Sequence, residues 1–147
     1  GFLCVLFYIN FSIELLMSVL GAFNNVLINF IDDCILVFPE DRDFKVYKAS
    51  IKILVKINPK KVLTIFANNT KLYKEQILEK NEDFFLKNDY SEVINNTKKT
   101  DISDDEINDI IKKIQGYWIE LEKTNKDKIW DYMLLLVNLS EKYFMPA

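Results

Sequence analysis

The feature that most constrains the fold is an apolar stripe with a helical repeat over residues 19–38. At about 100° per residue, one face of a helix collects apolar side chains from Val19, Phe23, Val26, Leu27, Phe30, Cys34 and Val37. The opposite face is polar, and the alternating patterns typical of β-strands are scarce along the whole chain. The spacing predicts an amphipathic helix that is capped by Ser18 and ends at Pro39.

The same repeat predicts further helices downstream. A second helix is expected over residues 43–57. Pro59 ends it and stands in the first turn of a short third helix. A fourth helix follows Thr70. Residues 81–100 are expected to form a long connection that contains a brief aromatic element, DFFL.

The last third of the chain has the clearest helix start. Ser103 and Glu106 form an S-x-x-E capping box ahead of an apolar stripe. A sixth helix is predicted over residues 126–144, after the short connection KTNKD, and a short connection makes consecutive helices antiparallel neighbours. We therefore expect the last two helices to pack together, with Trp118 and Trp130 in the core. The predicted fold class is all-α, a single-domain bundle of about six helices.

Residues 1–16 do not continue the amphipathic pattern, because their apolar side chains would point in all directions around a helix. A membrane helix needs about 20 apolar residues, whereas polar residues including Glu14 interrupt this stretch, and it has no Lys or Arg flank. A secretory signal would need a positive segment ahead of it. We interpret residues 1–16 as a non-native upstream extension, translated in frame before a helical bundle domain at 17–147. The alternative is an apolar segment that docks on a membrane or a protein.

The composition removes several classes of catalytic site. Without any His, the chain has no Ser-His-Asp or Cys-His pair and no His-containing zinc site. Its three Gly are scattered, so they form no phosphate-binding loop. The two Cys, Cys4 and Cys34, form no CxxC motif, and so few Cys favour a reducing compartment. The acidic run at 101–109 lacks the Gly and Glu of a calcium loop and is interpreted as a helix start. We expect no catalytic residue, no metal ligand and no cofactor.

Four lysines share one face of the second predicted helix: Lys45, Lys48, Lys52 and Lys56. The remaining faces are mostly apolar, so the helix is expected to be largely buried, with the lysines as its contact with solvent. Like charges four residues apart repel each other, so acidic residues of another helix or a bound anion must neutralise them. The four lysines are therefore a candidate face for a partner or an anion. Nucleic acid is not favoured, because the net charge is −3 and no aromatic residue interleaves with the lysines.

Three aromatic residues stand among charges in the predicted connection: Phe84, Phe85 and Tyr90. They are candidate partner-binding residues, since aromatic side chains are enriched at binding hot spots. The other interpretation is that the two Phe plug the bundle. We favour the plug, because exposed pairs of aromatic residues are uncommon on soluble monomers.

Four segments together resemble a known group of proteins: MSVLGAFNNVLINF at 17–30, FPED at 38–41, EDFFLKNDYS at 82–91 and WIELEKTNKDKIWDYMLLLVNLSEKY at 118–143. Over residues 17–144 the chain resembles a family of small uncharacterised helical proteins from giant viruses, the large DNA viruses of algae and protists. The resemblance implies a viral product in the host cytoplasm or the virion, not a secreted one. It implies no activity and no catalytic residue.

Together these observations predict a non-enzymatic helical protein–protein interaction module of a large DNA virus. The alternative is a binder of nucleic acid or anionic membrane through the lysine face. A membrane is expected as a partner only if residues 1–16 belong to the natural protein.

Overall fold

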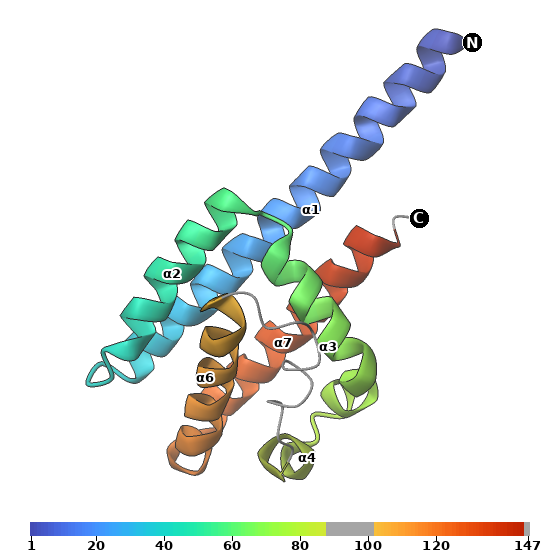
Figure 1. The fold of residues 1–147 in the computed structure, drawn as a ribbon. Coiled ribbons are helices and arrows are strands. Elements are labelled where there is room, and N and C mark those ends of the chain that lie inside the picture. Colours follow the sequence, from blue (N-terminus) through green and yellow to red (C-terminus); the bar gives the residue numbers. More distant parts are fainter. Residues whose placement is uncertain (88–101, 146–147) are drawn as a thin grey trace.

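The computed structural model describes residues 1–87 and 102–145, apart from the side chains of residues 102–105. The described residues form helices and no strand: α1 (Phe2–Val37), α2 (Asp43–Ile57), α3 (Lys61–Leu78), α4 (Glu82–Lys87), α6 (Ile102–Tyr117), the 3-10 turn η1 (Trp118–Glu120) and α7 (Lys123–Phe144). The prediction of an all-α single-domain bundle of about six helices is confirmed. Figure 1 shows its layout.

Helix α1 is much longer than the sequence pattern predicts. Instead of starting at Ser18, it runs without a break for 36 residues from Phe2. The added segment has no Pro or Gly to interrupt it, and a helix that has already formed propagates through such residues at little cost. The predicted end is correct: the helix stops at Val37, just before Pro39, because a proline disfavours helical geometry in the residue that precedes it.

Helix α2 has the predicted bounds, but the next two predicted helices are one. A turn at residues 58–60 precedes α3, and it is closed by the Lys61 amide, which donates to the Asn58 carbonyl over 3.1 Å. Helix α3 begins at Lys61, so Pro59 is not in the helix. Thr70, the predicted break, lies inside α3 and donates its hydroxyl to the Ala67 carbonyl. The helix ends where Lys80 adopts a left-handed φ of 53°.

The last two helices do not form the simple antiparallel pair that was expected. KTNKD is the first turn of α7 and not a connection, and the short turn η1 precedes it. Helix α7 packs mainly along α1 and α3, whereas α6 packs on α2. The backbone of α6 begins at Ile102, so the predicted cap residue, Ser103, lies within its first turn, and its side chain is outside the described part.

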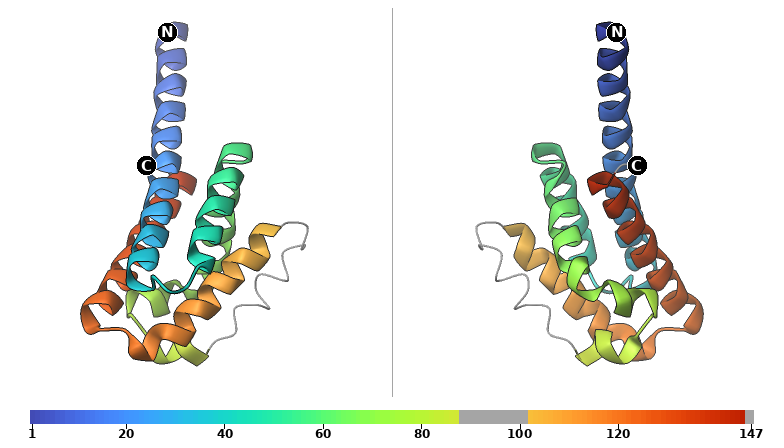
Figure 2. Two further views of the ribbon diagram at one scale, coloured as in Figure 1. Left: turned by 90° about the vertical axis from the view of Figure 1, so that its left-hand side faces the viewer. Right: turned by 90° about the vertical axis from the view of Figure 1, so that its right-hand side faces the viewer.

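The core has two parts. The larger part joins α1, α2, α6 and α7 and contains both tryptophans, as predicted. Their rings meet edge to face with centroids 5.7 Å apart. The smaller part joins α1, α3 and α7 around Leu20, Phe23, Val62, Leu63 and Leu136. Leu20 is the first buried residue of α1, so the bundle begins there and everything before it projects outwards (Figures 1 and 2).

Candidate functional site

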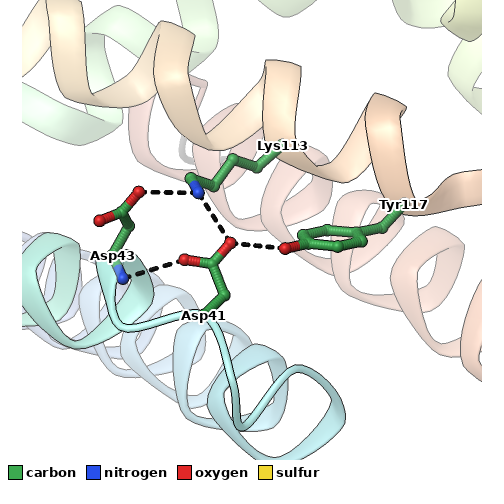
Figure 3. Close-up of polar contacts among 4 residues, drawn as sticks. All are labelled: Asp41, Asp43, Lys113 and Tyr117. Atoms are coloured by element: carbon green, nitrogen blue, oxygen red, sulfur yellow. Dashed lines mark hydrogen bonds and ion pairs between the residues drawn. The ribbon is translucent and has the colours of Figure 1, made fainter.

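The densest polar cluster links the turn between α1 and α2 to helix α6 (Figure 3). One oxygen of Asp41 accepts hydrogen bonds from the Lys113 ammonium and the Tyr117 hydroxyl, each over 2.7 Å. Its other oxygen accepts the backbone amide of Asp43 over 3.0 Å, at the start of α2. Lys113 also forms an ion pair with the Asp43 carboxylate over 2.7 Å.

The charges in this cluster stabilise one another. Burial alone would favour a neutral Asp41, but the hydrogen bonds from Lys113, Tyr117 and the Asp43 amide hold its pKa below the usual range. Hydrogen bonds to Asp41 and Asp43 raise the pKa of Lys113, which stays an ammonium ion. A hydrogen bond to the Asp41 carboxylate, with burial second, raises the pKa of the Tyr117 hydroxyl.

This cluster is built to hold helices together. A general base or nucleophile needs a free lone pair near the operating pH, and here the ammonium and the phenol are both kept protonated. The sequence alone does not predict this cluster. Lys113 and Tyr117 do share a face of α6 four residues apart, but nothing local indicates that Asp41, 72 residues before Lys113, meets them.

A cavity of about 170 Å³ lies between α1, α3, α4, α6 and α7. Its walls are almost entirely apolar, and Tyr73 is the one titratable side chain among the described residues that line it. Acid–base chemistry needs convergent titratable groups, which this lining does not offer. The cavity is therefore a gap in an apolar core, of a size that fits a single small ring.

The two cysteines lie in opposite environments. Cys34 is buried, and burial, reinforced by the charge of Asp33, raises the pKa of its thiol to about 12, so it is not a reactive thiolate. Cys4 is exposed on the projecting part of α1. Within the described part of the chain, no three Cys, Asp or Glu side chains lie close enough together to hold a metal ion.

The four predicted lysines fall into two groups. Lys48 turns back to the bundle and forms an ion pair with Asp32 of α1 over 2.6 Å. Lys45, Lys52 and Lys56 are exposed, and none of the three has an ion pair among the residues that the structure describes. An acidic residue of another helix therefore neutralises Lys48, which is one of the two outcomes expected for these lysines. The charges of Lys45, Lys52 and Lys56 remain in solvent.

The expectation that α2 is largely buried is wrong for one face. Val46, Ile53 and Ile57 are 59%, 60% and 77% exposed, in line along the outside of the helix. The opposite side, with Phe44, Tyr47 and Ile51, is buried against the core. Because α1, α6 and α3 cover only one side of α2, the second apolar side has no cover.

The predicted aromatic residues pack inwards where they are described. Phe85 lies against Trp118 and Trp130, with centroids 5.2 and 6.2 Å away, and its carbonyl accepts from Gln115. Phe84 packs on Tyr73. Both Phe are half-buried, which favours the plug interpretation over an exposed anchor. Tyr90 lies outside the described residues.

The fold and these surfaces define an all-α, single-domain bundle with an apolar interior and two uncovered apolar surfaces. No protein-family model, no curated protein and no solved structure matches the chain.

Proposed function

We propose that the chain is a non-enzymatic protein–protein interaction module of a large DNA virus. The viral origin rests on the sequence resemblance. The observation that carries the interaction role is the uncovered apolar row Val46, Ile53 and Ile57 on α2, which we call the α2 ridge. Such a row in line on one helix is uncommon on a soluble surface, and it marks a site for a partner.

The ridge has the geometry of a helix-docking surface. From Val46 to Ile57 it spans about 16 Å, or three helical turns. Lys45, Lys52 and Lys56 follow one edge of it. An amphipathic partner helix fits this surface if its apolar stripe covers the ridge and its acidic residues meet the lysines.

The test is affinity purification of the tagged full chain from infected cells, with quantitative mass spectrometry. Val46→Asp combined with Ile53→Asp puts charge on the ridge without touching the core. Leu72→Asp on α3 is the control, because Leu72 is also an exposed apolar residue, 66% accessible. We expect the wild type and the control to recover the same set of proteins, and the double variant to lose them. Equal recovery in all three samples would remove the ridge as the binding surface.

The lysine row gives nucleic acid as the alternative ligand. Binding through three point charges would be sequence-blind and would weaken steeply with salt. Fluorescence anisotropy with labelled single- and double-stranded DNA at physiological salt measures it, with Lys45→Glu, Lys52→Glu and Lys56→Glu combined as the comparison. Micromolar binding that this variant abolishes would make nucleic acid the leading ligand.

A further inference from the structure

The first half of α1 is an apolar helix with nothing packed on it. Its exposed side chains include Phe2, Leu3, Phe7, Tyr8 and Phe11 at 58–79% accessibility. By length and composition α1 is apolar enough to cross a membrane, and only 6% of its most apolar stretch is buried, so this stretch is not part of the core. It also continues directly into the bundle as one 36-residue helix, unlike the short apolar region of a signal peptide.

The end of the bundle from which this segment projects is basic. The end of α2, the start of α3 and the end of α7 all lie there (Figures 1 and 2). Two contacts fix the arrangement: Asn24 of α1 donates to the Pro59 carbonyl in the α2–α3 turn over 3.1 Å, and Tyr143 of α7 packs on the core around Leu20. Lys56, Lys60 and Lys142 are exposed on these ends.

Charge is distributed unevenly along the bundle. None of Lys56, Lys60 and Lys142 has an ion pair among the described residues, and Glu141 beside them is neutralised by Lys74 over 2.6 Å. Exposed apolar side chains stand among these lysines: Ile57, Phe144 and Met145. At the far end, around the turn between α1 and α2, the carboxylates of Asp32, Asp41 and Asp43 are paired with the ammonium groups of Lys48 and Lys113. Lysines mixed with apolar side chains around the base of an apolar helix are typical of a surface that lies on anionic lipid.

Against the interpretation of residues 1–16 as a non-native extension, we propose that residues 2–19 insert into a lipid bilayer and that the basic end of the bundle lies on its anionic headgroups. The twelve helical residues before Glu14 span about 18 Å, so the apolar part enters the roughly 30 Å hydrocarbon core without crossing it. Leu20 is the first buried residue of α1, and Glu14 lies six residues before it, about 9 Å along the helix, close to the roughly 5–8 Å thickness of a headgroup layer. The apolar residues before Glu14 then lie in hydrocarbon. The basic end shares Lys56 and Ile57 with the α2 ridge and its lysine edge. Val46→Asp with Ile53→Asp changes the ridge alone, and Leu3→Glu with Phe7→Glu changes the inserted segment alone, so either proposal can fail without the other.

The chain already contains one exposed thiol that can be labelled within the segment, Cys4. Cys4 is exposed within the segment and Cys34 is buried, so a thiol-reactive, environment-sensitive fluorophore labels Cys4 of the folded full chain. The experiment is flotation and fluorescence with phosphatidylcholine vesicles, with and without phosphatidylserine. We expect the protein to float with the vesicles, the emission to shift to the blue, and nitroxide-labelled acyl chains to quench it.

Two variants and one control separate the contribution of the apolar segment from that of the basic end. Leu3→Glu with Phe7→Glu places charges in the segment and should abolish flotation and quenching. Lys56→Glu, Lys60→Glu and Lys142→Glu together should weaken binding to phosphatidylserine vesicles by about tenfold or more and change binding to neutral vesicles little. Leu36→Glu with Ile119→Glu, exposed apolar sites elsewhere on the bundle, should bind like the wild type. Circular dichroism verifies the fold of each variant.

Three results would overturn the proposal. The full chain could remain unbound to both kinds of vesicle. The emission could shift with protein concentration alone, without quenching by lipid, which would show that the segment pairs with a second copy of the chain. Equal loss of binding in the Leu36 and Ile119 control would show that general surface hydrophobicity, and not this segment, drives the association.

Discussion

At the scale of single residues, Trp118 combines apolar packing, a hydrogen bond and a cation–π contact. It is 1% exposed, its indole donates to the Glu82 carboxylate over 2.5 Å, and Lys126 lies 5.6 Å from the centre of its ring. It therefore connects the short helix α4 to the bundle through both apolar and polar contacts. The next residue, Ile119, is 85% exposed.

This contrast between neighbours defines a prediction. Trp118→Ala should lower the free energy of unfolding by about 3–5 kcal/mol, since it opens a cavity and removes the indole hydrogen bond to Glu82. Ile119→Ala should change it by less than about 0.5 kcal/mol, because nothing packs there. Urea unfolding followed by far-UV circular dichroism measures both. Equal effects at the two positions would mean that Trp118 is not a core residue.

Asp41 gives a prediction about pH. Its pKa is lowered in the folded state, so its contribution to stability is present above the unfolded pKa of about 3.9 and is lost as the pH falls through the folded value. Asp41→Asn should cost roughly 1–3 kcal/mol at neutral pH, and the difference from wild type should shrink below about pH 4. Urea titrations across this pH range measure it.

The control for this prediction is Glu40→Gln, an exposed neighbour without the hydrogen bonds of Asp41. It should follow the wild-type curve closely. If the Asp41→Asn difference kept the same size at every pH, the carboxylate charge would not be what stabilises the turn between α1 and α2.

At the scale of elements, the continuity of α1 is the main departure from the pattern of the sequence. Gly21 lies within this helix, close to where the projecting part meets the bundle. A Cβ added there meets nothing within 4 Å, and its backbone φ is negative. The glycine is thus a weak point in the helix that no packing contact requires.

Gly21→Ala should therefore raise the free energy of unfolding by about 0.5–1 kcal/mol, because alanine loses less backbone entropy in a helix interior. Gly116→Ala is the comparison: that site is equally open but lies one residue from the end of α6, where helices fray and the gain is smaller. Thermal unfolding monitored by circular dichroism measures both. A loss of stability in Gly21→Ala would indicate that α1 bends at this position.

At the scale of the whole molecule, the bundle and the projecting segment are physically separate. From Phe2 to Met17 every side chain is exposed except Ser12 and Leu16, which are half-buried, and the core begins at Leu20. Removing the segment therefore removes almost no buried area. A protein that starts at Met17 should unfold cooperatively, with a midpoint within a few degrees of the full chain.

Calorimetry of the two proteins tests this separation in the absence of lipid. A shorter protein that is molten or insoluble would show that residues 1–16 complete the core. The short protein should also fail to float with vesicles, since it lacks the residues that enter the bilayer. Calorimetry shows whether the bundle of this protein is folded, so loss of flotation can be assigned to loss of the segment.

Local sequence determined most of the helical content. The bounds of α2, the end of α1 before Pro39 and the burial of both tryptophans follow from apolar spacing and from proline geometry. These properties depend on residues within a few positions of each other, so a single sequence is enough to predict them. The breaks predicted at Thr70 and Ser18 were wrong, because polar residues within a helix reduce its propensity without ending it.

Tertiary structure decided which faces are covered. The spacing of α2 shows apolar residues on two sides, and only the placement of α1, α3 and α6 on one of them leaves Val46, Ile53 and Ile57 in solvent. Likewise, the meeting of Asp41 with Lys113 joins segments far apart in the chain, and so does the gathering of the end of α2, the start of α3 and the end of α7 at one end of the bundle. Periodicity reports the angle of a side chain around its own helix, and only packing sets what that side chain faces.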